Sequence, residues 1–181
     1  GLIGRAAAIF RVDEIIIFQD NPETKQRAES DLVTSLLAYM ETPQYLRKRL
    51  FRLKPELQYA GILPPLRTPH HPVNRKMRDL KIGEYRESVV LSTREGTLVD
   101  IGVEQPALIL NKQLPIGERV TVKIAKVGKQ IEVEMADRAE IPDYWGYVIA
   151  VEKHPLGKIL KTRRFDLTVA TSKYGAPFAN V

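Results

Sequence analysis

The hydrophobic period of this chain changes twice, and this change limits the folds that the chain can adopt. Between Arg86 and Met135, apolar and polar residues alternate, as in "ERVTVKIA" and "IEVEMA". Alternation with a period of two is typical of strands that bury one face. Glycine-containing turns recur, so about five short strands fit into this stretch of roughly fifty residues. The pattern predicts a small antiparallel β-barrel, most simply of the OB type.

The sequence on both sides of this region is typical of an α/β fold. Ala6–Ile9 favours helix, and Ile15–Phe18 is an apolar, β-branched run that predicts a parallel strand covered on both faces. Near the other end, Pro155–Lys161 predicts a helix and Leu167–Ala170 predicts a second buried strand. Because each flank is too short to fold alone, the simplest architecture is one α/β domain with an inserted barrel. The predicted segments are residues 1–82, 83–140 and 141–181.

Two helices are predicted between the first strand and the barrel. The first has a start signal in which Asn21 is the cap, Pro22 lies in the first turn and Glu23 lies near the positive end of the helix dipole. The second helix is predicted to have Thr42 as its cap, followed by Pro43. The residues expected to face inward are Leu32, Val33, Leu36, Leu37 and Met40 in the first helix, and Leu46 and Leu50 in the second.

Positive charge is concentrated in one part of the chain. The net charge is +6, and residues 21–82 hold twelve basic and six acidic side chains, whereas residues 83–140 hold eight and ten. A basic surface of this kind binds phosphates without reading sequence, so RNA is the expected partner, and the acidic balance of the barrel argues against a phosphate-binding face there. A solvated helix face is the alternative. The candidate RNA-binding residues are Arg47, Lys48, Arg49, Arg52, Arg67, Arg75, Lys76 and Arg78.

A proline-rich stretch, "ILPPLRTPHHP", lies between the α/β half and the barrel. Proline restricts the backbone and the stretch carries apolar residues, so a packed, rigid loop is expected rather than a flexible tether. His70 and His71 are candidates for RNA contact, or they bond carbonyl groups of the loop itself. A structural strap and a substrate-binding loop both remain open.

Several functional classes are excluded or made less attractive by composition. Cysteine is absent, which excludes disulfides and thiolate zinc sites and fits a reducing, cytoplasmic setting. Three histidines are too few for a convincing metal site, so no metal is expected. No apolar run approaches the about 20 residues that cross a bilayer, so no membrane partner is expected. Common hydrolase motifs and nucleotide-binding loops do not occur.

The aromatic residues Tyr144, Trp145 and Tyr147 directly follow the predicted barrel. They could stack on unpaired bases. Large aromatic side chains commonly fill the junction between two parts of a fold, and this structural interpretation is favoured.

Six segments, taken in order, resemble one known family: "GLIGRAAAIFRVDEIIIF", "TPQYLRKRLF", "ELQYAGILPPLRTPHHP", "GTLVDIG", "YWGYVI" and "DLTVATSKYG". They are similar to archaeal and eukaryotic RNA methyltransferases of the SPOUT class that carry an OB-like insertion, from Gly1 to about Pro177. The resemblance implies a Rossmann-like α/β domain with a C-terminal trefoil knot, a homodimer, S-adenosylmethionine as methyl donor and RNA as acceptor. Relatives point to a ring nitrogen of a uridine in ribosomal RNA.

The resemblance also implies roles for individual residues. Arg5 corresponds to an arginine that faces the active site and orients the RNA or the target base; the alternative is a helix arginine paired with an acidic neighbour. Thr171 and Ser172 follow a predicted strand, in a loop that borders the cofactor in this family, and Gly175 would give that loop backbone freedom. A serine–threonine turn at a strand end is the alternative.

One departure from the family affects the expected function. Members normally begin with a strand before Gly1 and continue past the Ala-Thr-Ser loop into the knot, so these residues alone are not expected to form the complete cofactor pocket. The leading hypothesis is an S-adenosylmethionine-dependent RNA methyltransferase. A non-catalytic RNA-binding or ribosome-assembly protein with the same fold is the main alternative, and a dimerising structural module is a third.

Overall fold

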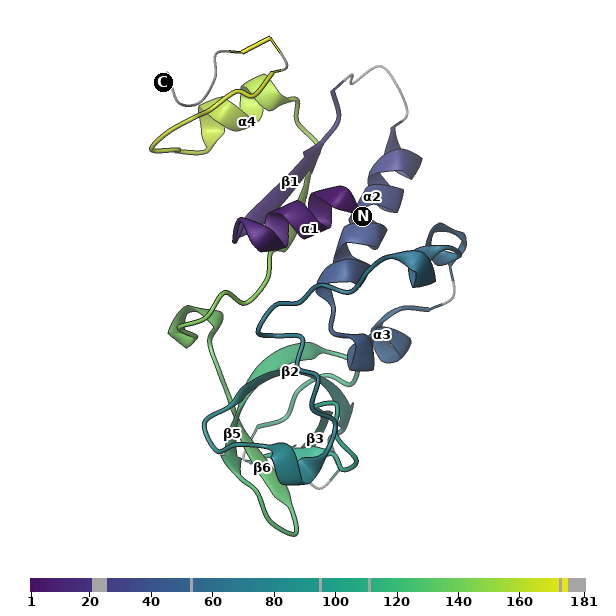
Figure 1. Ribbon diagram of the computed structural model, residues 1–181, viewed down its shortest axis with the longest axis vertical. Helices are drawn as coiled ribbons and strands as arrows, with labels where there is room; N and C mark the ends of the chain where they lie inside the picture. Colours follow the sequence, from purple (N-terminus) through teal and green to yellow (C-terminus); the bar gives the residue numbers. More distant parts are fainter. Residues whose placement is uncertain (21–25, 53, 95, 111, 173, 176–181) are drawn as a thin grey trace.

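The structure is a computed structural model that describes residues 1–20, 26–52, 54–94, 96–110, 112–172 and 174–175. The molecule is elongated, with a β-barrel at one end and a small parallel sheet flanked by helices at the other (Figure 1). The segments before and after the barrel both return to the same sheet, so the barrel is placed between two strands that pair with each other.

The parallel sheet consists of strands β1 (Glu14–Phe18) and β7 (Val148–Glu152), paired from Glu14 opposite Val148 to Phe18 opposite Glu152. The helices at this end and at the junction are α1 (Leu2–Ile9), α2 (Arg27–Glu41), α3 (Gln44–Leu50) and α4 (Leu156–Thr162). In the described part of the chain, four short 3₁₀ turns occupy Pro55–Leu57, Ala60–Ile62, Met77–Asp79 and Arg138–Glu140.

The barrel is closed and its strands follow the order β2-β3-β4-β6-β5. Their bounds are β2 Tyr85–Ser92, β3 Thr97–Asp100, β4 Ala107–Ile109, β5 Arg119–Lys126 and β6 Ile131–Met135. The predicted barrel is confirmed, but the prediction that it is antiparallel is wrong, because β4 and β6 pair in parallel. A closed ring with an odd number of strands cannot alternate direction throughout, so at least one parallel pair is unavoidable.

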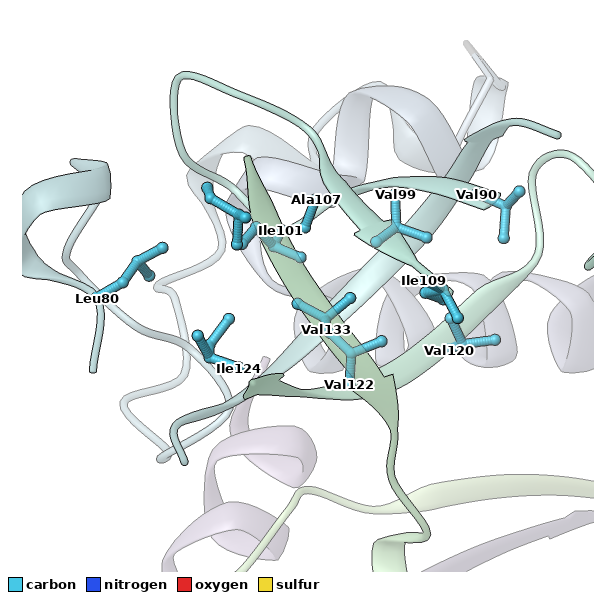
Figure 2. Packing of buried hydrophobic residues seen from close by; sticks show 11 residues of the cluster. Leu80, Val90, Val99, Ile101, Ala107, Ile109, Val120, Val122, Ile124 and Val133 are labelled. Atoms are coloured by element: carbon cyan, nitrogen blue, oxygen red, sulfur yellow. The ribbon is translucent and has the colours of Figure 1, made fainter. Parts of the chain in front are cut away.

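The barrel interior is filled by apolar side chains that project inward from alternate strand positions (Figure 2). Val120, Val122 and Ile124 on β5 are all at most 8% exposed, as are Ile131 and Val133 on β6. The period-two interpretation of both segments is therefore confirmed. This cluster is the larger of the two cores and buries β-branched residues that suit a pleated surface.

The second, smaller core lies where α1, α2 and the junction meet the parallel sheet. Ala7, Leu37, Met40, Leu66 and Tyr147 are buried there, and Ile15, Ile17 and Ile149 pack against them. The prediction that β1 is covered on both faces is wrong, since all three of its isoleucines are only half-buried. The cover comes from α2, which contacts both strands.

The prediction of a second buried strand at Leu167–Ala170 is also wrong. These residues form no strand, and Leu167 and Val169 are 80% and 60% exposed. The partner of β1 is β7, which follows the aromatic junction and runs alongside β1 with Ile149, Ala150 and Val151. A sheet joining sequences on both sides of the barrel is thus observed, with a different second strand.

The predicted helices agree with the structure in part. The start signal at Asn21, Pro22 and Glu23 lies outside the described residues, and α2 begins at Arg27. Thr42 ends α2 and does not cap the next helix, because Pro43 occupies that cap position. Leu37, Met40 and Leu46 are buried as predicted, Leu36 and Leu50 are half-buried, and Leu32 and Val33 are 39% and 38% exposed. The helix predicted at Pro155–Lys161 is confirmed as α4, with Pro155 at its cap.

Candidate functional site: two hollows beside a proline strap

The proline-rich stretch is a packed, extended segment. Along Leu63–His71, here named the proline strap, Leu66, Thr68 and His70 are buried while Arg67 and Pro69 between them are exposed. Leu66 belongs to the smaller core. Because its proline rings fix φ and its inward side chains are anchored, the strap holds Arg67 outward on a rigid backbone. The expected packed loop is confirmed.

Two of the hollows that adjoin the strap share Pro65, Leu66, Arg67 and Thr68 among their lining residues. The first, here named the α1 hollow, measures about 450 Å³ and is also lined by Arg5 from α1. The structure thus brings Arg5 and Arg67 together, although they are far apart in sequence.

The second, here named the α3 hollow, measures about 650 Å³ and is also lined by Gln44 and Tyr45 from α3 and by Arg75. Arg67 borders both hollows. Sequence reasoning missed Gln44, Tyr45 and Thr68, because ordinary polar residues carry no signal until the fold places them around one space.

The predicted basic residues of α3 divide into two groups. Arg47 donates hydrogen bonds to the carbonyls of Met40 and Thr42, at 3.2 and 2.8 Å, and its guanidinium lies 4.5 Å from the centre of the Tyr39 ring. Arg49 forms an ion pair with Asp100 at 2.6 Å. These two arginines are engaged within the protein, and their structural role is the better supported one.

Lys48 and Arg52 are exposed and line a further hollow of about 1100 Å³, which Leu63 and Pro65 of the strap also line. Arg75 and Lys76 are exposed beyond the strap. With Arg67 and Arg78, which is also exposed and lies 3.8 Å from Asp79, these residues are the exposed members of the predicted RNA-binding set without the close pairing of Arg47 and Arg49.

The two histidines of the strap both contact Glu41. The Nε2 atoms of His70 and His71 lie 2.9 and 2.7 Å from the backbone carbonyl oxygen of Glu41. His70 is fully buried, so it does not fit the predicted role in RNA contact and instead anchors the strap to the end of α2. Burial and, to a smaller extent, the neighbouring His70 lower the pKa of His71 to about 4, against the opposing effect of the hydrogen bond to the Glu41 carbonyl.

A buried ionic cluster connects the barrel to α2; it is named here the junction cluster and consists of Glu41, His70, Glu87, Arg119 and Trp145. Arg119 on β5 contacts both Glu41 carboxylate oxygens, at 2.6 and 3.0 Å, and also pairs with Glu87 on β2. Burial raises the pKa of Glu41, but hydrogen bonds from His70 and Arg119 outweigh it and hold this pKa at about 2. Sequence alone did not reveal this cluster, because its members come from five segments that are distant from one another in the chain.

The aromatic residues after the barrel fill the junction, as the structural interpretation predicted. The Tyr144 hydroxyl donates to the carbonyl of Val12 at 2.8 Å, and the Tyr147 hydroxyl donates to that of Leu37 at 3.0 Å. The Trp145 indole N–H donates to the Glu87 carboxylate at 2.6 Å. These three bonds tie the segment to the sheet end, to α2 and to the barrel respectively.

The residues predicted to contact the cofactor lie apart from the hollows. Thr171, Ser172 and Gly175 are exposed, and the Gly175 amide donates to the Ser172 carbonyl at 3.0 Å in a turn. None of the three lines the hollows beside the strap. Within the described residues no cluster of three or more metal-ligating side chains occurs. None of the described helices has the length and apolar character that a bilayer crossing needs.

The fold and this surface define a mixed α/β protein with a five-stranded barrel and a concave, basic face of the kind that binds polyanions. The chain belongs to the family described as "Putative RNA methyltransferase", whose model matches residues 1–181. It is 34% identical to the mouse 28S rRNA (uridine-N(3))-methyltransferase over 99% of this chain and 52% of the relative.

Two further relatives carry the same description. The human protein is 32% identical over 99% of this chain and 54% of its own length. The Drosophila melanogaster protein is 33% identical over 97% of this chain and 41% of its own length. The chain therefore spans about half the length of these relatives.

Proposed function

We propose that this chain is part of an S-adenosylmethionine-dependent methyltransferase that modifies N3 of a uridine in ribosomal RNA. The support is the family match over residues 1–181, together with relatives that are described by this reaction. The observation that links the proposal to particular residues is that Arg5 and Arg67 both line the α1 hollow.

At the level of the fold, we propose that residues 1–82 and 141–181 form a Rossmann-like SPOUT domain and that residues 83–140 are an OB-like insertion. The parallel pairing of β1 with β7 supports this division, because an insertion leaves the strands of its host adjacent. The closed, five-stranded barrel supports the OB-like assignment. The trefoil knot, the homodimer and the cytoplasmic location stay predictions.

In this mechanism the chain binds and orients the RNA. Uridine N3 must give up its proton to solvent water, which leaves negative charge on the nitrogen and the adjacent carbonyl oxygens. A guanidinium at hydrogen-bond distance stabilises that charge and remains protonated throughout. Arg5 and Arg67 therefore supply the two cations needed, one for the base edge and one for a phosphate. The donor, when bound, supplies a methyl group already activated by its sulfonium, so orientation is the main task left.

The residues assigned to the donor do not form a pocket for it. Thr171, Ser172 and Gly175 are exposed, and the predicted strand before them is absent. The alternative function, a non-catalytic RNA-binding or ribosome-assembly protein that retains the fold, is separated from methyl transfer by experiment.

Calorimetric titration of the full-length protein with S-adenosylmethionine separates the two functions. It is combined with transfer of a labelled methyl group to ribosomal RNA that lacks the modification. Donor binding and transfer are expected; neither would occur with a protein that only binds RNA.

Arg5→Ala then tests the assigned residue, and its matched control is Arg27→Ala, another exposed helix arginine that lines none of the hollows. We expect Arg5→Ala to lower methyl transfer by about a hundredfold, because the variant lacks the guanidinium that stabilises the developing negative charge. Thermal stability is expected to be unchanged, because Arg5 is exposed. Arg27→Ala is expected to behave as wild type. Full activity in Arg5→Ala would remove Arg5 from the site.

A further inference from the structure

The proline strap is anchored on both sides of Arg67. Before it, Leu66 belongs to the smaller core, and after it, His70 is fully buried. The His70 Nε2 lies 2.9 Å from the backbone carbonyl oxygen of Glu41 and 3.3 Å from its carboxylate. Because both oxygens accept, Nε2 carries the hydrogen and directs it at Glu41. The position of Arg67 therefore depends on where Glu41 holds His70.

Glu41 is itself held by the barrel. Arg119, the first residue of β5, contacts both Glu41 carboxylate oxygens, at 2.6 and 3.0 Å. A bidentate pair fixes the orientation of the carboxylate as well as its position. Since the Glu41 side chain is only 8% exposed, water does not readily replace these contacts. Glu41 thus connects a strand of the barrel to the strap.

A second path from the barrel to the strap runs through Trp145. The Trp145 indole donates to Glu87 of β2 at 2.6 Å, and the centre of its ring system lies 5.9 Å from that of His70. The next residue, Gly146, packs its backbone against the same histidine. A Cβ at Gly146 would lie 2.6 Å from the His70 ring and 2.9 Å from a Glu41 carboxylate oxygen. Packing this close leaves the histidine and the carboxylate little room to move independently.

We propose that Arg119 is a positioning residue, through which the inserted barrel sets the place of Arg67 at the α1 hollow. Arg119 does not line this hollow and acts through Glu41 and His70. The three prolines of the strap restrict its backbone, so a displacement of His70 is passed on to Arg67 and is not absorbed between them. A misplacement of about 1 Å at a reacting centre costs up to about a hundredfold in rate. The inference rests on the proposed function for the role of Arg67, but not for the coupling of barrel and strap.

Native-state amide hydrogen exchange of the full-length protein tests the coupling without RNA or donor. The reporter is the His71 amide, which donates to the Thr68 carbonyl at 2.9 Å within the strap. The matched control is Ile131→Ala, which creates a cavity in the barrel core outside the junction cluster and destabilises the barrel to a similar extent. We expect the protection factor of the reporter to be about tenfold lower in Arg119→Met than in Ile131→Ala, because only Arg119→Met loosens the anchor of the strap.

A double-mutant cycle with Arg67 tests the functional consequence. Methyl transfer to ribosomal RNA that lacks the modification is measured for Arg119→Met, Arg67→Ala and the double variant, at a temperature where circular dichroism shows each to be folded. Arg119→Met alone is expected to lower kcat/KM about tenfold. Added to Arg67→Ala, it is expected to cause less than about a twofold further loss, because the group that it positions is already absent. Ile131→Ala is expected to leave kcat/KM unchanged in both backgrounds.

Glu41→Gln repeats the cycle with a variant that keeps the shape of the side chain, should Arg119→Met fold poorly. The amide retains one oxygen for Arg119, so a smaller loss of about threefold is expected, again only when Arg67 is present. Equal protection of the strap in Arg119→Met and Ile131→Ala, or a full further loss of transfer in the Arg67→Ala background, would overturn the positioning role. Absence of methyl transfer from the wild-type protein would overturn the proposed function instead, and hydrogen exchange alone would then decide whether barrel and strap are coupled.

Discussion

Replacing Arg119 by methionine tests whether the junction cluster holds the barrel against α2. The guanidinium contacts both oxygens of Glu41, at 2.6 and 3.0 Å, which is the bidentate geometry of a strong ion pair. Methionine keeps an apolar stem of similar length, so the packing of that stem is largely preserved. The Glu41 side chain is only 8% exposed. In the variant, His70 is the side-chain partner that it keeps among the described residues.

The size of the effect follows from the pKa of Glu41. Burial alone would raise this pKa, but the bonds from His70 and Arg119 hold it at about 2, compared with its ordinary value of 4.5. That difference corresponds to about 3 kcal/mol of stability at neutral pH. Removing one partner of a buried pair typically costs about 3–5 kcal/mol. We expect Arg119→Met to lower the free energy of unfolding by about 3 kcal/mol, and Tm by roughly 10 °C.

The pH dependence has a defined sign. Because the pKa of Glu41 is lower in the folded state, its contribution is fully present above about pH 4.5 and is lost as the pH falls towards 2. Wild-type protein is expected to lose stability across this window. The Glu41→Gln variant, which cannot titrate there, is expected to lose about 3 kcal/mol less across it.

Urea unfolding followed by tryptophan fluorescence measures these differences. Trp145 is the single tryptophan of the chain, and its indole donates to Glu87 inside the junction cluster. Far-ultraviolet circular dichroism, recorded in parallel, reports whether the barrel unfolds in the same transition. Arg49→Met is the control: it also removes an ion pair at 2.6 Å, but its side chain is 51% exposed, so a loss of at most about 1 kcal/mol is expected. Equal, small losses in the Arg119 and Arg49 variants would refute a stabilising role for the junction cluster.

Three further outcomes are expected. Gly146→Ala should destabilise the protein in urea unfolding by at least about 1 kcal/mol more than Gly117→Ala. The two glycines have similar φ values of 84° and 86°, but of the two only Gly146 would place a Cβ in a clash, 2.6 Å from the buried His70 ring. Equal losses in the two variants would contradict this. Trp145→Phe should cost about 2 kcal/mol, because a buried carboxylate loses an indole donor, and thermal unfolding measures it. Lys48→Ala and Arg52→Ala should each weaken ribosomal RNA binding and reduce the slope of log affinity against log salt by about one, which an unchanged slope in salt titrations would disprove.

The elements that sequence predicted well are those whose pattern is local. The alternation in residues 118–125 and 131–136 reports directly which side chains face the barrel interior, because successive residues of a strand point to opposite faces. The α4 helix was recognised from Pro155 and the residues after it for a similar reason.

The sequence predictions are wrong where one local pattern is compatible with two different structures, because only tertiary packing distinguishes them. Leu167–Ala170 and Val148–Glu152 are both short apolar runs, and the aromatic anchors before the second run place it beside β1. Likewise, His70 and His71 are adjacent in sequence, but His70 is fully buried and His71 lines a hollow. This difference depends on how the strap is anchored to the Glu41 carbonyl.

The barrel, the rigid character of the proline strap and the basic character of the surface can all be read from local sequence, because they follow from residue spacing, proline geometry and charge. Which cations are paired within the protein depends on the tertiary fold: Arg47 and Arg49 bond groups of the protein, whereas Arg5 and Arg67 line one hollow. The physical reason is that burial and pairing depend on contacts between segments far apart in the chain, and no local pattern encodes those contacts.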